Sequence, residues 1–85
     1  HGGCLMTFAD IALFQTAYQE MEGKNGVTVQ LDSTLVDGVY EGELVEATGE
    51  VVRAGGSLIF VRGQITVEAR TVMTFSGVIR KFGGR

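Results

Sequence analysis

Asp10 is the side chain in this sequence best placed to do chemistry, because it stands in an apolar run. Phe8 and Ala9 precede it, and Ile11 and Ala12 follow it. A carboxylate in such surroundings is costly unless it is paired or hydrogen-bonded, and burial raises its basicity. These properties suit a general base or a nucleophile. The alternative is an ordinary helix-surface aspartate at a gap in the packing.

The second candidate group is the backbone of His1-Gly2-Gly3, which lies just ahead of the same apolar run. Glycines let a substrate approach the backbone closely, and free N–H groups at the start of a helix favour negative charge. An oxyanion formed from an acyl group would suit this position. The alternative is that the glycine pair is only a turn before a helix.

Composition and charge argue against several other classes of function. The 85 residues are 45% hydrophobic and 20% charged, with a net charge of -3 and no basic block, which disfavours nucleic acid as a partner. One histidine and one cysteine, Cys4, leave no internal disulfide and argue against a dedicated metal centre; we interpret Cys4 as a small core residue. No apolar stretch reaches the roughly 20 residues that span a bilayer, and no signal peptide is evident. We expect one cytoplasmic domain over residues 1–85, without a membrane partner.

One helix and a set of strands must position the candidate groups. The segment from Cys4 to about Met21 predicts a helix that the glycine pair precedes, and its apolar residues go nearly all the way round. A helix of this kind is buried on most faces. After Gly26 the sequence reads as strand.

The strands are indicated by alternation and by turn signals. Val27, Val29 and Leu31 alternate with polar residues, which is typical of a half-buried strand. Further strand patterns cover 40–53, 58–61, 65–70 and 72–81, with a hairpin turn at 54–56. These patterns predict an α+β domain in which four antiparallel strands form a meander and one sheet face covers the helix.

Three motifs together resemble one known family. They are His1-Gly2-Gly3, Asp10 nine positions after the histidine, and the strand opening Gly26-Val27-Thr28-Val29. This combination resembles the hotdog-fold acyl-CoA thioesterases of the phenylacetate-degradation type, over essentially the whole chain. The resemblance implies a sheet wrapped around one long central helix and the hydrolysis of an acyl-CoA thioester without a cofactor.

The resemblance also implies roles for individual residues. The backbone N–H of Gly2 would polarise the thioester carbonyl, and His1 would help to shape that oxyanion pocket. Asp10 would activate water or attack the carbonyl, and Thr28 would position the water. Gly3, Phe14, Arg53 and Arg62 are the candidate substrate-binding residues, Phe14 for the acyl group and the arginines for CoA. Ordinary core packing for Phe14 and solvated charges for the arginines are the alternatives.

Helix geometry predicts that the site is shared between two subunits. Gly2 and Asp10 are eight residues apart, or about 12 Å along a helix, so one chain cannot bring both to one carbon. We expect a homodimer, with a dimer of dimers as a further possibility. Relatives usually have a polar amide residue and a strand before the histidine, so we expect the N-terminal strand to be missing here.

There are three alternatives to hydrolysis. A non-catalytic acyl-CoA-binding module would keep the glycine turn but not need Asp10, and a truncated fragment would only dimerise. A hotdog hydratase or dehydratase is disfavoured because the chain has no proline and one histidine. The sequence specifies neither the acyl group nor the pathway.

Overall fold

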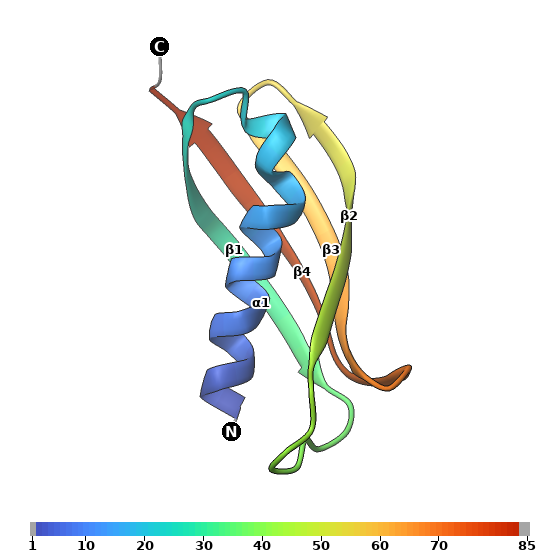
Figure 1. The fold of residues 1–85 in the computed structure, drawn as a ribbon. Helices are drawn as coiled ribbons and strands as arrows, with labels where there is room; N and C mark the ends of the chain where they lie inside the picture. The colour runs from blue at the N-terminus through green and yellow to red at the C-terminus, as the bar shows by residue number, and fades with distance from the viewer. Residues whose placement is uncertain (1, 84–85) are drawn as a thin grey trace.

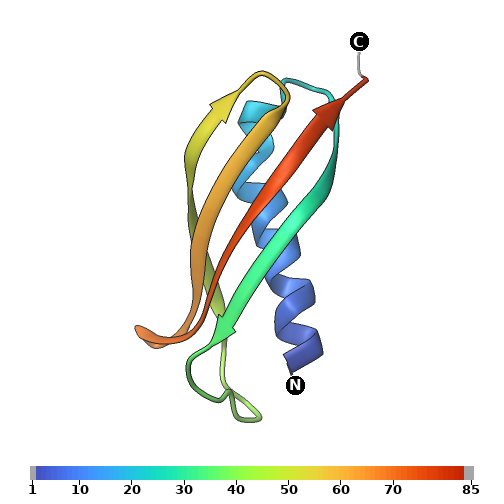
Figure 2. The ribbon, with the colours of Figure 1, turned by 180° about the vertical axis from the view of Figure 1, so that it is seen from behind.

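The fold is one helix laid across one face of an antiparallel sheet, as the computed structural model shows for residues 2–83 (Figures 1 and 2). Within these residues the sheet has four strands in the order β1-β4-β3-β2. The elements, in chain order, are α1 (Gly2–Ala17), the 3-10 helix η1 (Tyr18–Met21), β1 (Asn25–Leu35), β2 (Glu46–Gly55), β3 (Leu58–Val67) and β4 (Arg70–Phe82).

The helix differs from its prediction at both ends. It begins at Gly2, so the glycine pair forms its first turn instead of preceding it. The backbone N–H groups of this first turn have no acceptor within the helix. Its α-helical part ends at Ala17, and the 3-10 turn continues to Met21 before Glu22 adopts a left-handed conformation with φ 58°.

The prediction that the helix is buried on most faces was wrong. One side, which includes Leu5, Ala9 and Leu13, packs on the sheet and is buried. The far side is not covered in the single chain: Ile11 is 50% exposed, and Cys4, expected in the core, is also exposed. The reason is that a single sheet covers only one side of a cylinder.

The predicted four-stranded meander was also wrong. β2, β3 and β4 follow one another as hairpins, but β1 pairs with β4 instead of β2. The connection 36–45 therefore passes from one edge of the sheet to the other. Its last residues, 40–45, were predicted as strand but are not part of the sheet. Figure 1 shows this connection at the lower end of the molecule.

Arg70 holds the connection 36–45 against the start of β4. Its guanidinium pairs with Asp37 at 3.0 Å and with Glu43 at 2.9 Å, and it donates a hydrogen bond to the carbonyl oxygen of Gly38 at 2.9 Å. The hydrogen bond from Arg70 holds the pKa of the Asp37 carboxyl below its usual value. The crossing is thus fixed by contacts between residues that lie far apart in the sequence.

The β2–β3 turn is shifted from its predicted position, and the β3–β4 turn lies within a segment that was predicted as strand. The β2–β3 turn is formed at Gly56 and Ser57, because Gly55 already pairs with Leu58. The β3–β4 turn consists of Glu68 and Ala69, which the alternation assigned to a strand; both have positive φ, 51° and 71°. Two-residue hairpins with positive φ at both positions match the twist of the strands they join.

Candidate active site

Asp10 and Thr28, which the sequence places 18 residues apart, meet in the folded chain. The Thr28 hydroxyl donates a hydrogen bond to Asp10 Oδ1 at 2.9 Å, from β1 to the second half of α1, and both residues are half-buried. Oδ2 of Asp10 accepts no hydrogen bond from residues 4–83. The carboxylate is therefore oriented by one oxygen and leaves the other available to a reacting group.

A β-bulge in β1 turns Thr28 toward the helix. Thr28 pairs with Ile79 of β4 and Gln30 pairs with Val78, so Val29 is the extra residue between them. Bulges re-aim side chains and are frequent next to active sites. As a result Val27 and Val29 are 44% and 53% exposed, whereas the alternation had suggested that these valines are the half-buried positions.

The candidate oxyanion donors stand at the N-terminal end of α1. Gly2 and Gly3 are in its first turn, where backbone N–H groups have no intrahelical acceptor. Asp10 follows Gly2 by eight positions along the α-helix, which is a rise of about 12 Å. His1 lies outside the described residues. The structure thus brings Asp10 to Thr28, but it does not bring Gly2 to Asp10 within one chain.

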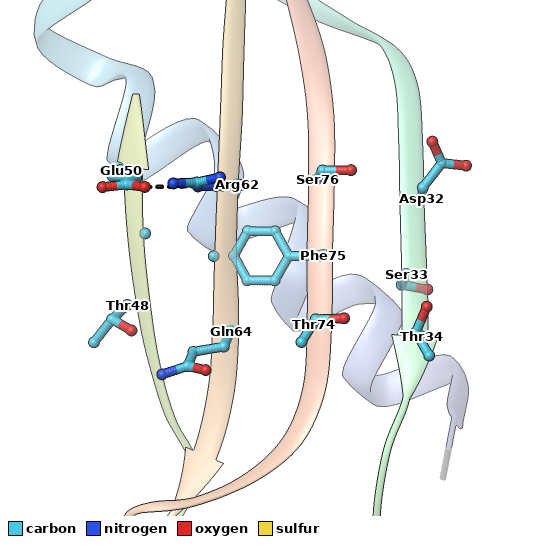
Figure 3. Close-up of a pocket in the computed structure, with 12 residues that line it drawn as sticks. Asp32, Ser33, Thr34, Thr48, Glu50, Arg62, Gln64, Thr74, Phe75 and Ser76 are labelled. Atoms are coloured by element: carbon cyan, nitrogen blue, oxygen red, sulfur yellow. Dashed lines mark hydrogen bonds and ion pairs between the residues drawn. The ribbon is translucent and has the colours of Figure 1, made fainter. Parts of the chain in front are cut away.

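The two arginines proposed for CoA stand on β2 and β3, whereas Asp10 contacts β1 through Thr28. Arg53 is exposed near the end of β2. Arg62 lies on the sheet face that points away from the helix and pairs with Glu50 on the neighbouring strand at 2.6 Å (Figure 3). Phe14, by contrast, follows Asp10 by one helical turn and is half-buried.

The outer face of the sheet carries a broad hollow of about 590 Å³, lined mainly by polar side chains, that the sequence patterns did not predict. Two cross-strand rows run through it: one contains Asp32, Ser76, Arg62 and Glu50, and the other contains Thr34, Thr74, Gln64 and Thr48 (Figure 3). It lies on the opposite side of the sheet from Asp10. The sequence alone does not show such rows, because the side chains that stand next to each other on neighbouring strands are known only once the pairing register is known.

Two further properties of the described region bear on the chemistry. Residues 4–83 contain no group of three histidine, cysteine, aspartate or glutamate side chains that could hold a metal ion. Between residues 2 and 83, no helix combines the length and the apolar character needed to cross a bilayer.

Comparison with known proteins identifies the family. The family model described as the thioesterase superfamily matches residues 1–81. The chain belongs to the thioesterase superfamily. Its fold is that of the hotdog thioesterases, as the resemblance of its sequence motifs predicted. Comparison with curated protein sequences gives no match.

Several solved structures share the fold. The BH2602 protein of Bacillus halodurans, solved with CoA, is 27% identical with a TM-score of 0.87, and the match covers 100% of this chain and 57% of that one. The PaaI protein of the phenylacetic acid degradation operon of E. coli is 25% identical with a TM-score of 0.87, covering 99% and 60%. A hypothetical thioesterase of Streptococcus pneumoniae, solved with coenzyme A, is 25% identical with a TM-score of 0.86, covering 100% and 68%. The chain therefore spans less than two thirds of the length of the first two proteins.

Proposed function

We propose that this chain hydrolyses acyl-CoA thioesters, with Asp10 as the catalytic carboxylate. The observation that carries the proposal is the hydrogen bond from Thr28 to Asp10, which holds a half-buried carboxylate with one oxygen committed and one available. Membership of the thioesterase superfamily supports the reaction type. The presence of CoA in two of the similar structures supports a CoA ester as the substrate.

Asp10 and Thr28 can activate a water molecule without any other ionisable group. Because the Thr28 hydroxyl donates its hydrogen to Asp10, its oxygen can still accept one from water. Oδ2 of Asp10 accepts the other water hydrogen and takes it as a proton when the water oxygen attacks the thioester carbon. The resulting tetrahedral oxyanion then collapses, the C–S bond breaks, and the CoA sulfur takes the proton from Asp10. The products are the free acid and CoA.

The oxyanion donor in this proposal is the Gly2 backbone N–H of a second subunit. A carbonyl oxygen must lie within roughly 3 Å of its donor, and the 12 Å between Gly2 and Asp10 along one helix forbids this within one chain. Two antiparallel helices related by a two-fold axis place the first turn of each beside the middle of the other. Two-fold homodimers are the commonest assemblies of soluble proteins, so the arrangement requires no unusual symmetry.

Complementation between two inactive variants tests the proposal. Asp10→Asn should keep the fold and lower turnover by at least about 100-fold, the scale of losing a general base. Gly2→Pro removes the backbone donor at a position where a helix tolerates proline. Each homodimer should be nearly inactive, whereas a mixed dimer contains one site with an intact Gly2 and an intact Asp10.

The readout is release of free CoA, detected with a thiol reagent, across a panel of acyl-CoA esters. Mixed dimers, verified by two different affinity tags, should recover about half of the wild-type activity per dimer, since one of two sites is restored. Mixed dimers as inactive as their parents would refute the shared site. A folded Asp10→Asn protein with wild-type turnover would refute the catalytic role and favour a binding module.

A further inference from the structure

Lys81, near the end of β4, is the least exposed of the basic side chains that form ion pairs in the described region. Its side chain is 9% exposed, against 35% for Arg70 and 66% for Arg62. Its Nζ donates a hydrogen bond to the carbonyl oxygen of Glu20 at 2.9 Å and lies 3.3 Å from Oε1 of Glu22. A buried ammonium group is costly unless it is paired and hydrogen-bonded. These contacts therefore hold the ammonium at one place, where it joins β4 to the end of η1.

The two acceptors belong to the segment that connects the helix to β1, which passes beside the end of β4 (Figures 1 and 2). Glu20 is in the last turn of η1, where carbonyl groups have no donor within the helix. Glu22 and Gly23 then turn the chain toward β1 with positive φ values of 58° and 76°. The sheet side of the contact is fixed as well, because the backbone N–H of Lys81 donates to the carbonyl oxygen of Ser57 at 2.8 Å.

Lys81 and Thr28 hold the helix to the same half of the sheet. Gly26 of β1 pairs with Lys81 of β4, and Thr28 pairs with Ile79 of β4, so both side chains stand on one hydrogen-bonded pair of strands. α1 packs mainly against β2 and β3, and less against this pair. The distance between Asp10 and Thr28 therefore depends on polar links between the helix and the β1–β4 pair more than on apolar packing.

We propose that Lys81 is a positioning residue for the hydrolysis, because it holds the helix at the distance from β1 at which the Thr28 hydroxyl reaches Asp10. The inference rests on the proposed function. The hydrogen bond between the two side chains is 2.9 Å long, and a displacement of about 1 Å takes their oxygen atoms beyond hydrogen-bond range. Lys81 thus acts through Thr28 and touches no reacting atom itself.

Lys81→Met tests this inference, since it keeps the length and the apolar stem of the side chain and removes the ammonium group. Loss of the hydrogen bond from Thr28 to a carboxylate sets the size of the effect, so kcat should fall about 10-fold. KM should change by less than about twofold. Lys24→Met is the matched control, because Lys24 is an exposed lysine in the same connection, and it should leave both constants unchanged.

A double-mutant cycle separates positioning from a general loss of stability. In a Thr28→Val background the hydrogen bond is already absent, so Lys81→Met should lower kcat by less than about twofold, while its effect on Tm is the same in both backgrounds. An equal fall of kcat in both backgrounds, or a lowered Tm with unchanged kcat, would give Lys81 a purely structural role and overturn the inference. If Lys81→Met does not fold, Lys81→Gln carries the same comparison with a neutral side chain that tolerates water.

The carbon NMR signal of the Asp10 carboxylate provides a readout that does not need catalysis. Lys81→Met and Thr28→Val should displace this signal in the same direction at neutral pH, because both remove the same hydrogen bond. Lys24→Met should leave it in place, and Lys81→Met should add nothing in the Thr28→Val background. If no ester is hydrolysed, the proposed function fails, and this comparison still decides the inference. An Asp10 signal that Lys81→Met does not move would overturn it.

Discussion

Replacing Thr28 by valine isolates the contribution of one hydroxyl to the reaction. The substitution keeps the shape of the side chain and removes the donor to Asp10 Oδ1 at 2.9 Å. A hydrogen bond to a charged group contributes about 1.5–3 kcal/mol, and the half-exposed position places this one at the low end. At 1.36 kcal/mol per decade we expect kcat to fall about 10- to 30-fold. KM should change by less than about twofold, because the hydroxyl acts on the water and the base.

Two controls and a double-mutant cycle make this prediction specific. Thr28→Ser retains the hydroxyl and should keep most of the turnover. Thr34→Val removes an exposed threonine hydroxyl from the outward side of the same strand and should have no effect. In an Asp10→Asn background, Thr28→Val should cost much less than in the wild type, because the two groups act as a unit. A raised KM with unchanged kcat, or an equal loss in both backgrounds, would refute the proposed arrangement.

Two further predictions concern stability. Replacing Glu68-Ala69, with φ of 51° and 71°, by Asn-Gly should stabilise the protein by about 1 kcal/mol and raise Tm by roughly 4–8 °C in thermal denaturation; an unchanged Tm contradicts it. Arg70→Gln should speed hydrogen exchange in residues 36–45 at neutral pH. Because Arg70 holds the pKa of Asp37 below 3.8, its stabilisation is complete above that pH and is lost as pH falls through the lower folded value. The stability difference between wild type and Arg70→Gln should therefore shrink below about pH 3.8, and a constant difference in acid denaturation would exclude this linkage.

The fold brings two of the predicted site residues, Asp10 and Thr28, into contact, whereas the predicted strand order was wrong. Composition and spacing predicted the helix, and Asp10 was selected because a carboxylate in an apolar run needs a partner. The partner, Thr28, came from the resemblance and not from the strand pattern. A bulge at Val29 shifts the alternation by one residue, and no local pattern reports a bulge before the pairing strand is known.

Strand order was missed because it depends on contacts that are remote in the sequence. Strand patterns that follow one another in the sequence favour a meander. No local pattern within 36–45 indicates that this segment crosses from β1 to the opposite edge of the sheet, where β2 lies. What fixes the crossing is Arg70, whose partners Asp37 and Glu43 lie 33 and 27 residues away. The left-handed turn at Glu68-Ala69 was missed for the opposite reason, since neither residue type favours positive φ.

The shared-site proposal also determines which edge of the sheet must join the two subunits. β1 and β2 are the two edges in the described sheet, separated by three strand spacings or about 14 Å, and Thr28 places Asp10 beside β1. A partner added to β2 would hold its Gly2 too far from Asp10, whereas antiparallel pairing of two β1 strands sets the two helices side by side.

The edges can be compared by matched substitutions, because Val29 on β1 and Val52 on β2 are both bulge residues and are 53% and 55% exposed. A lysine on an edge strand opposes its pairing with another strand. Val29→Lys should therefore yield monomers in sedimentation and abolish turnover, while Val52→Lys leaves both the dimer and its activity intact. A Val29→Lys protein that remains dimeric and active would show that β1 is not the joining edge. Monomers that remain active would show that one chain holds a complete site, and the oxyanion donor would then have to be a group other than Gly2.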